Sequence, residues 1–434
     1  MTPEVKQRIE QIRQGIVPKG YVKDKDGIYP RDWASKKIGQ WLKLAERPIV
    51  LKDEEEYQLV TVRRGFGGVD SRGSFLGKNV LVKNYFIVKT GDFIISKRQI
   101  AHGACGIVPP ELDGAVVSNE YNVFLPQDGT NIQMFNLMMQ LPHYKRLFYL
   151  MSDGVHIEKL LFKTQDWMKR TLAMPLLKEQ KKIAEILTTQ DRAIELQGRK
   201  IEELKRFKQG CLERMFPRKG QKVPEKRFPG FTDDWELCKF SDLAETRRGL
   251  TYNPSSISDS GIRVLRSSNI AEDQFIYGED DVFVEPDAVN IPKVTQGDIL
   301  ITSANGSTRL IGKHAIIRDI PNNSAVHGGF MLLAVARNPE FANALMSAPW
   351  YTKFISLYVA GGNGAIGNLN KSDLDDQDVY VPENSEQMVI GQYFSQLDHL
   401  ITLHQRKLEE MKKQKKALMQ LLLTGIVRTK GEEQ

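Results

Sequence analysis

Residues Pro175 to Phe216, PLLKEQKKIAEILTTQDRAIELQGRKIEELKRFKQGCLERMF, recur in altered form as Pro382 to Leu423, PENSEQMVIGQYFSQLDHLITLHQRKLEEMKKQKKALMQLLL. The two stretches align without a gap at an offset of 207 residues, and 13 of their 42 positions are identical. Average composition would give about two or three matches by chance. The chain therefore contains an internal duplication, and this duplication is interpreted before any single motif.

Each copy has the pattern of one long helix. A proline marks the start of each copy, no proline follows within it, and apolar residues recur at alternating steps of four and three. At 1.5 Å per residue each helix would be about 60 Å long. Two unrelated amphipathic core helices are the alternative, which we disfavour because the identities include charges such as Arg199 and Glu203.

We expect the two helices to pack on each other through a heptad seam. The apolar seam residues are Leu187, Ile194, Ile201 and Leu204 in the first copy and Leu397, Ile401, Leu408 and Met411 in the second. The seam also contains polar residues, with Gln197 expected opposite His404 and Lys208 near Lys415. These polar residues either set the register or are only tolerated in the seam.

Composition limits the class of protein. The chain has 434 residues, 41% of them hydrophobic, which suffices for two or three domains. A net charge of +7 favours, weakly, a polyanionic partner. Three dispersed cysteines argue against a disulfide framework, and no apolar run reaches 18 residues. The N-terminus has no apolar signal core, so we expect a cytoplasmic protein.

The duplication extends into the segments between the helices. The Gly-Asp stretch at 88–96 matches that at 294–302, at an offset of 206 residues. Pro142 and Gly154 match Pro349 and Gly361 at the offset of 207 found for the helices. Short β-like runs open each segment and helical runs close it, which predicts two α+β domains. The predicted boundaries are an N-terminal helical segment (1–17), a first domain (18–173), a first helix (174–216), a linker (217–229), a second domain (230–381), a second helix (382–424) and a tail (425–434).

The order of the parts predicts the topology. The first helix runs from the first domain to the second, so the second helix has to run back. The predicted fold is thus two similar α+β domains separated by two long antiparallel coiled-coil helices, a circular repeat with pseudo-two-fold symmetry. Both chain termini should lie near the first domain, where the helical segment Val5–Ile16 would pack.

Familiar catalytic motifs are absent or incomplete. Gly362, Gly364 and Gly367 form a G-x-G-x-x-G, but no βαβ unit surrounds them, so a dinucleotide site is rejected. The segment 303–314 resembles a phosphate loop, but its glycines are one residue too far apart. The seven histidines are dispersed, and neither they nor the cysteines have metal-ligand spacing.

Basic and amide side chains instead gather beside glycines at similar places in both domains. Arginine and asparagine make bidentate contacts to bases, and lysine suits phosphates. Each of these side chains alone could simply be solvated, but as two matched sets they predict a DNA-facing surface. The candidate DNA-binding residues are Arg63, Arg64, Arg72, Lys97 and Arg98 in the first domain and Arg247, Arg248, Arg266, Asn269, Asn305, Arg309 and Lys313 in the second.

The pattern resembles the DNA-specificity subunit of type I restriction-modification systems over essentially the whole chain. Three features carry the resemblance. They are the helix openings P-x-x-x-E-Q-x-x-I at Pro175 and Pro382, the aromatic-rich segment 228–235 at the start of the second domain, and the stretch GNGAIGNL at 362–369. The first domain departs from the pattern, because Gly154-Val155-His156 replaces that last stretch and its entry lacks Phe-Pro-Gly.

The resemblance implies a non-catalytic prokaryotic subunit with two target-recognition domains, each reading one half of an asymmetric bipartite site on double-stranded DNA. The helices would set the spacer and dock two methyltransferase (modification) subunits, and restriction/translocase subunits would join them. The chain itself would bind no metal or cofactor; S-adenosylmethionine, ATP and Mg²⁺ would belong to the partners. Two alternatives are a non-DNA coiled-coil scaffold with two protein-binding domains and a self-contained nuclease-methyltransferase, which the missing motifs disfavour.

Overall fold

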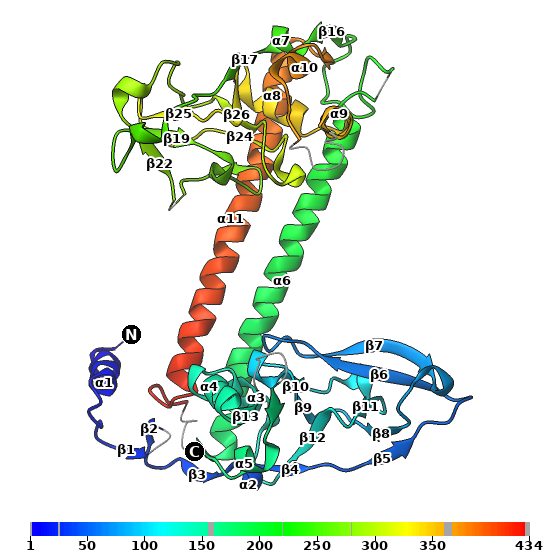
Figure 1. Cartoon of the computed structure of the whole chain (residues 1–434), viewed down its shortest axis with the longest axis vertical. Coiled ribbons are helices and arrows are strands. Elements are labelled where there is room, and N and C mark those ends of the chain that lie inside the picture. Colours follow the sequence, from blue (N-terminus) through cyan, green and yellow to red (C-terminus); the bar gives the residue numbers. More distant parts are fainter. Residues whose placement is uncertain are drawn as a thin grey trace. The chain divides into compact units, whose positions relative to one another are not determined.

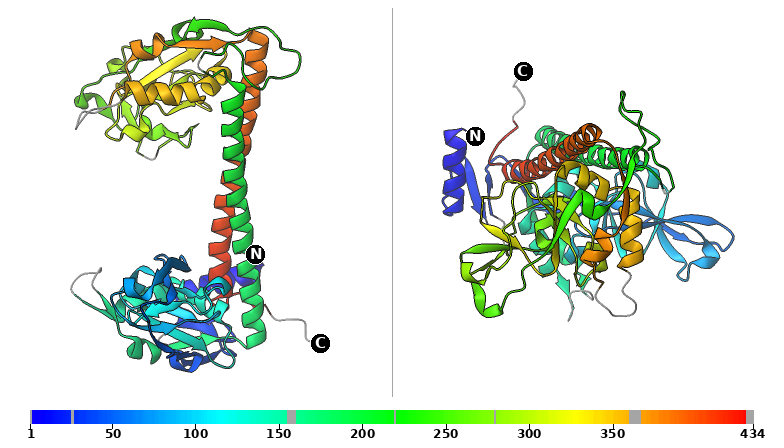
Figure 2. Two further views of the ribbon diagram at one scale, coloured as in Figure 1. Left: turned by 90° about the vertical axis from the view of Figure 1, so that its right-hand side faces the viewer. Right: turned by 90° about the horizontal axis from the view of Figure 1, so that it is seen from above.

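The computed structural model describes residues 2–24, 27–154, 160–218, 220–278, 280–359 and 367–429. The chain forms two compact units, one comprising the residues up to Leu196 and from Leu408 onward, the other Gln197–Lys407 (Figures 1 and 2). Each unit contains one α+β domain and part of both long helices. The predicted α+β class with an internal repeat is confirmed. Gly362, Gly364, Val155 and His156, which were singled out in the sequence, lie outside the described residues.

A four-stranded antiparallel sheet with the same strand order forms the frame of each domain. The orders are β10-β9-β12-β4 and β24-β23-β26-β17. The bounds in the first domain are β4 (Leu42–Leu44), β9 (Phe93–Ser96), β10 (Cys105–Ile107) and β12 (Tyr121–Pro126), and in the second β17 (Ala244–Arg248), β23 (Ile299–Thr302), β24 (His314–Ile316) and β26 (Met331–Ala336). All four residues of β9 and of β23 are buried, as expected for central strands covered on both faces.

The Gly-Asp landmark forms the turn that begins each central strand. Gly91 and Gly297 have φ values of +85° and +96°, a conformation that glycine adopts at little cost. The carboxylates of Asp92 and Asp298 each accept a hydrogen bond of 2.8 Å from the backbone N–H three residues earlier. The glycine allows the positive φ of the turn, and the aspartate closes the turn with its hydrogen bond. These two roles explain why the Gly-Asp pair recurs.

The second sheet differs between the domains. In the first it has five strands in the order β5-β8-β11-β6-β7, and in the second four in the order β18-β22-β19-β25. Each contains one parallel pair, β11 with β6 and β19 with β25. The bounds are β5 (Pro48–Val50), β6 (Glu56–Val62), β7 (Val69–Leu76), β8 (Asn84–Ile87) and β11 (Val116–Ser118), and then β18 (Ile257–Ser258), β19 (Ile262–Leu265), β22 (Val282–Val284) and β25 (Ala325–His327).

The remaining short elements again correspond in pairs. The helices are α2 (Ile38–Trp41) and α7 (Phe240–Leu243), α3 (Ile132–Met139) and α8 (Pro339–Met346), α4 (Pro142–Leu150) and α9 (Pro349–Tyr358), and α5 (Thr164–Met168) and α10 (Lys371–Asp375). Two strand pairs close the domains, β3 (Ala34–Lys37) with β15 (Thr171–Met174) and β16 (Glu236–Lys239) with β27 (Asp378–Val381). Small hairpins are β1 (Tyr21–Asp24) with β2 (Gly27–Pro30), β13 (Ser152–Asp153) with β14 (Leu161–Phe162), and β20 (Ile270–Ala271) with β21 (Gln274–Phe275).

The core of each domain includes the start of one long helix and the end of the other. In the first unit Ile183 and Leu187 are buried together with Leu422 and Leu423. In the second unit the equivalent set is Ile390 and Phe394 with Met215 and Phe216. The helices are therefore part of the domain cores, and replacing one of these residues would leave a cavity in a domain.

The long helices are α6 (Leu177–Met215) and α11 (Asn384–Leu422), and they are antiparallel within each unit (Figure 1). In the first unit Lys415 Nζ lies 2.5 Å from a carboxylate oxygen of Asp191. In the second unit Lys208 makes the equivalent pair with Asp398, also at 2.5 Å. The expected proximity of Lys208 to Lys415 is therefore wrong, because each lysine instead neutralises an aspartate of the facing helix.

The polar seam pair Gln197 and His404 does meet as expected. Gln197 Nε2 lies 2.8 Å from both Nδ1 and the carbonyl oxygen of His404. Of the apolar seam residues, Leu187, Ile201 and Ile401 are buried, and Ile194, Leu204, Leu397, Leu408 and Met411 are half-buried.

A buried arginine–glutamate pair explains the glutamate of the repeated P-x-x-x-E-Q motif. Arg227, which follows α6, donates to both carboxylate oxygens of the fully buried Glu386 at 2.8 and 2.7 Å. Arg428, which follows α11, contacts Glu179 at the same two distances and also binds Asp32. In each unit, the chain that leaves one long helix is thus tied to the start of the other.

The glutamine of the motif closes the helix entry. Gln180 Nε2 donates to the carbonyl of Pro175 at 2.8 Å, and Gln387 Nε2 donates to that of Pro382 at 2.9 Å. Both bonds connect the first helical turn to the proline five residues earlier. The motif therefore specifies how the chain enters the helix.

The two chain ends meet in the first unit. Tyr21 Oη donates to the carbonyl of Gly425 at 2.6 Å, and Arg8 contacts the carbonyl of Ile426. The N-terminal helix α1 spans Pro3–Arg13 and so begins and ends earlier than the predicted Val5–Ile16. Gly15 adopts φ +74° after the helix, and Ile16 is exposed. Among the residues that the structure describes, no helix combines the length and apolar character needed to cross a bilayer.

Candidate nucleic-acid interface

In the second domain three loops meet beside the end of β17. The backbone bridges from Leu250 to Gly328, and a Cβ added to Gly249 would lie 1.9 Å from the Gly328 carbonyl oxygen. Only glycine at position 249 allows this approach. The N–H groups of Ser303 and Ala304 donate to the carbonyl of Phe330 at 2.9 and 3.1 Å, which joins the loop that follows β23 to the same place.

Several predicted side chains lie on these loops. Arg248 is exposed, and no side-chain hydrogen bond or ion pair of Arg248 is present within the described part of the chain. Asn305 Nδ2 donates to Ser267 Oγ at 2.9 Å, which connects the β23 loop to the turn after β19. Arg266, about one-third exposed, contacts Asp280. These three residues come from separate parts of the sequence and are brought together by the fold.

Other predicted residues of the second domain lie elsewhere or are engaged. Arg247 forms a two-fold contact with Glu245 on its own strand, at 2.9 and 2.8 Å. Arg309 is exposed on the short 3₁₀ turn Thr308–Leu310. Lys313 is half-buried and lines the pocket described below.

The prediction that Asn269 contacts DNA is wrong for this conformation. Its side chain is completely buried. Its amide donates to the carbonyl of Ile276 at 3.1 Å and to Asp281 at 2.8 Å, and its oxygen accepts from the N–H of Arg266 at 2.8 Å. Asn269 is therefore a structural residue of the turn that carries Arg266, a role that its sequence position beside a basic residue did not reveal.

In the first domain the two predicted basic segments lie together. The N–H groups of Gly65 and Phe66 donate to the carbonyls of His102 and Gly103 at 2.7 and 2.9 Å. These bonds place the β6–β7 loop, which contains Arg63 and Arg64, against the segment that follows β9.

Most basic side chains of this first-domain surface already have an acidic or carbonyl contact. Arg63 is paired with Asp70 although its side chain is exposed. Arg98 Nε lies 2.7 Å from Glu120, and Lys97 contacts the carbonyl of Asn119. Arg72 is exposed on β7. DNA would have to compete with these pairs, which are exposed and so cost little to break.

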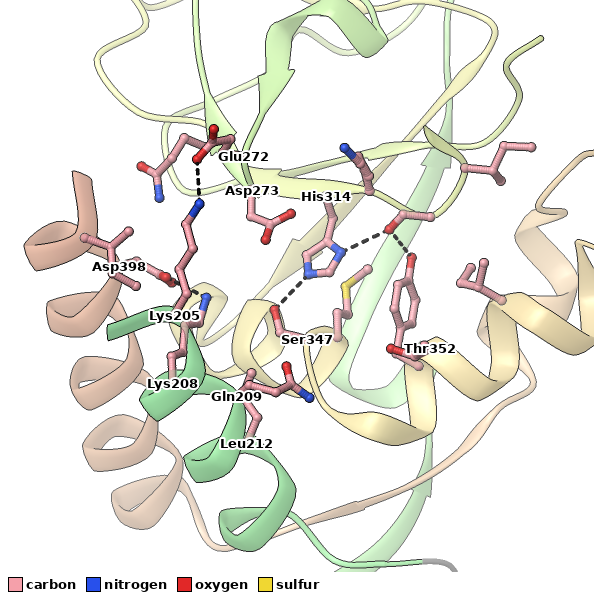
Figure 3. Close-up of a pocket in the computed structure, with 18 of the residues that line it drawn as sticks. Lys205, Lys208, Gln209, Leu212, Glu272, Asp273, His314, Ser347, Thr352 and Asp398 are labelled. Atoms are coloured by element: carbon pink, nitrogen blue, oxygen red, sulfur yellow. Dashed lines mark hydrogen bonds and ion pairs between the residues drawn. The ribbon is translucent and has the colours of Figure 1, made fainter. Parts of the chain in front are cut away.

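A polar pocket of about 600 Å³ lies between the second domain and the helix segments of the same unit (Figure 3). Lys205 pairs with Glu272 at 3.0 Å and Lys208 with Asp398 at 2.5 Å. His314 is held by the Gly312 carbonyl and by Ser347 Oγ at 3.1 and 3.2 Å, and burial lowers its pKa. Because these side chains pair with one another, they connect the second domain to the helix segments. Within the described ranges no three His, Cys, Asp or Glu side chains stand close enough to hold a metal ion.

The family model for the type I restriction modification DNA specificity domain matches the chain twice, at residues 30–206 and 232–413. The chain belongs to this family of DNA-specificity subunits. The two matches cover both domains and most of both long helices, so each half of the duplication carries one copy of the family's domain. The alternative of a generic coiled-coil scaffold is not supported.

Two curated relatives of this specificity subunit match it over more than half or nearly all of its length. It is 22% identical over 427 residues to the type I restriction enzyme MjaVIII specificity subunit of Methanocaldococcus jannaschii, covering 93% of this chain and 94% of the relative. It is 26% identical over 263 residues to the EcoKI specificity subunit of Escherichia coli, covering 58% of this chain and 56% of the relative.

Solved structures from type I restriction-modification systems share the fold. The S subunit of the type I restriction-modification system from M. genitalium superposes with a TM-score of 0.57 at 13% identity, covering 90% of this chain and 96% of that one. A chain from a structure of type I R-M complex assembly gives 0.55 at 15% identity, with 92% and 99% covered. At such identities the likeness concerns the fold alone.

Proposed function

We propose that this chain recognises an asymmetric, bipartite site on double-stranded DNA, with each α+β domain reading one half. The observation that carries the proposal is the combination of a shared frame sheet with different side chains on its loops. Equivalent loops carry Arg98 with Glu120 in the first domain and Ala304 with Phe330 in the second. Two DNA-recognition domains that share one sheet but carry different side chains on its loops suit two half-sites of different sequence. Contacts to the bases, and not those to the phosphates, distinguish one sequence from another.

The two long helices would set the spacer between the half-sites. Each has 39 residues, which corresponds to about 58 Å of helix. This length is somewhat under two turns of B-DNA at about 34–36 Å per turn. A continuous helix resists changes in length, so the spacer would be fixed by the number of helical residues.

The same helices would dock two copies of a modification (methyltransferase) subunit. Leu196 and Leu403 occupy equivalent positions in the repeat and are 62% and 46% exposed. Their equivalence in the two copies makes these exposed leucines candidates for contact with the same kind of partner. The charges that recur beside them, Glu202 and Glu203 with Glu409 and Glu410, are also exposed.

The chain itself would catalyse no reaction. It would be the subunit of the complex that recognises the DNA sequence. Methyl transfer with S-adenosylmethionine would belong to the modification subunits, and ATP- and Mg²⁺-dependent translocation and cleavage to the restriction subunits. The assembly would work in the prokaryotic cytoplasm, where its DNA target is found. The surplus of seven positive charges supports association with a polyanion.

Domain replacement combined with methylome sequencing tests the proposal. The chain is expressed with its modification subunit, and residues 230–381 are replaced by the equivalent domain of another specificity subunit. One half of the methylated motif should change while the other half stays the same. The matched control replaces residues 18–173 and should change the opposite half. If both halves or neither change in either chimera, the assignment of one half-site to each domain is wrong.

A further inference from the structure

Phe330 is an aromatic residue held at the surface of the second domain. This residue is 75% exposed, whereas the next residue, Met331, is 1% exposed. Its carbonyl accepts the two hydrogen bonds from Ser303 and Ala304, so the backbone position is fixed. Leaving this large apolar side chain in water does not stabilise the fold, so its position beside the candidate interface suggests a contact with a ligand.

The surroundings of Phe330 are those of the candidate interface. A Cβ added to the adjacent Gly329 would lie 3.1 Å from Thr251 Oγ1, and one added to Gly328 would lie 4.0 Å from Arg266 Cγ. The N–H of Ala304, which binds the Phe330 carbonyl, immediately precedes Asn305. The phenylalanine therefore stands at the junction of the loops that carry Arg248, Arg266 and Asn305.

The first domain has different chemistry at the same point of the frame. There the N–H of Lys97 donates to the carbonyl of Glu120 at 2.9 Å, as the N–H of Ser303 does to that of Phe330. Glu120 and Phe330 each stand immediately before the frame strand that the two domains share, β12 or β26. Glu120 forms an ion pair with Arg98, whereas the second domain has an apolar ring and an alanine.

An apolar ring among hydrogen-bonding groups suits one feature of the major groove. The methyl group of thymine is the apolar group that a base edge presents there, and side chains such as phenylalanine contact it. We propose that Phe330 reads a thymine methyl in the half-site of the second domain. This inference rests on the proposed function and names one base contact within it.

Replacing thymine by deoxyuridine tests the contact, because this change removes only the methyl group. The specificity subunit is used in complex with its modification subunits, on a duplex that carries the motif found by methylome sequencing. Deoxyuridine is placed at each thymine of the second-domain half-site in turn. At one position the wild type should bind about fourfold more weakly, the value expected for one buried methyl group. Phe330→Ala should weaken binding to the thymine duplex and show no further loss at that position.

A matched control and a folding check accompany this measurement. Leu237→Ala removes another exposed apolar side chain of the same unit, 56% exposed on β16, and should retain the wild-type response to deoxyuridine. Phe330→Ala should unfold at the wild-type temperature, since the ring has few contacts to lose.

Three results would overturn the inference while leaving the proposed function intact. In the first, the half-site read by the second domain contains no thymine. In the second, Phe330→Ala keeps the wild-type sensitivity to deoxyuridine. In the third, the wild type is insensitive at every thymine but increases the fluorescence of a 2-aminopurine placed in the half-site, which would indicate base unstacking by an inserted ring. If the wild-type complex gives no bipartite motif at all, the proposed function itself fails.

Discussion

At the scale of single residues, the repeated glutamates Glu179 and Glu386 show how one position can serve two purposes. Both lie in the first turn of a long helix, where a carboxylate interacts favourably with the helix dipole. The structure adds that both are largely buried and held by Arg428 and Arg227, which belong to distant parts of the chain. The helix opening is therefore also a junction between segments.

Replacing Arg227 should show how much its pair with Glu386 contributes to the free energy of unfolding. Arg227→Met leaves the carboxylate of Glu386 buried with no cation, and breaking a buried pair from one side costs about 3–5 kcal/mol. We expect a loss of this size in the free energy of unfolding, measured by urea titration. The double variant Arg227→Met with Glu386→Gln should recover part of the loss, because no unpaired charge remains.

Lys412→Met provides the control for Arg227→Met. Lys412 and Glu409 form an ion pair at 2.8 Å, but both side chains are more than half exposed. Such surface pairs contribute little to stability, so this variant should unfold as the wild type does. If Arg227→Met costs no more than Lys412→Met, the junction has no special energetic role.

His327 should make stability depend on pH. Burial lowers the pKa of His327 to about 4, and its Nε2 lies 3.2 Å from the carbonyl of Arg247. The unfolded chain takes up a proton near pH 6.5 that the folded chain refuses until about pH 4. The contribution of His327 to the free energy of unfolding is therefore fully present above pH 6.5. It declines as the pH falls towards 4, by up to about 1.4 kcal/mol per pH unit.

His327→Gln isolates this effect, since glutamine can still donate to the Arg247 carbonyl but does not titrate. Urea unfolding at pH 7, 6 and 5 should give a shallower fall for the variant than for the wild type. The slope is the informative quantity, because the variant also changes packing at pH 7. Equal slopes would show that His327 is not held neutral in the folded chain.

At the scale of elements, the frame sheet and the long helices are repeated closely while the second sheet is not. The frame sheet and the helices share buried positions, so their residues are constrained by packing. The second sheet has five strands in one domain and four in the other, and it lies outside the core that includes the helices. The second sheet can therefore differ between domains that recognise different DNA sequences.

The exposed faces of α6 and α11 carry a prediction about partners. If the helices dock two modification subunits as proposed, Leu196→Lys and Leu403→Lys should each remove one of them, because the leucines are equivalent and exposed. Light scattering coupled to size-exclusion chromatography should show one bound copy for each single variant and none for the double variant.

The matched control for the partner prediction is Leu357→Lys, which changes a 65% exposed leucine on α9. This variant should still bind two copies. If the helix variants also keep both copies, the partner surface lies elsewhere on the chain.

At the scale of the whole molecule, the duplication was predicted well, whereas the predicted DNA contacts stay a prediction. The alternation of apolar residues and the matching landmarks gave two α+β domains, two long helices and chain ends that meet, all of which the structure contains. The basic residues of the first domain come together as two loops joined by backbone hydrogen bonds. The burial of Asn269 was not apparent from its sequence neighbours, and a search for basic groups does not consider an exposed apolar residue such as Phe330.

The sequence by itself determined the repeat, the periodic helices and the glycine-dependent turns, because periodicity and backbone conformation are local properties that adjacent residues specify. Only the tertiary structure decided which side chains lie together. Lys208 faces Asp398 and not Lys415, Arg227 reaches Glu386 across 159 positions, and Asn269 is buried while Phe330 is exposed. These outcomes depend on contacts between residues far apart in the chain, where packing and the pairing of charges outweigh any local preference.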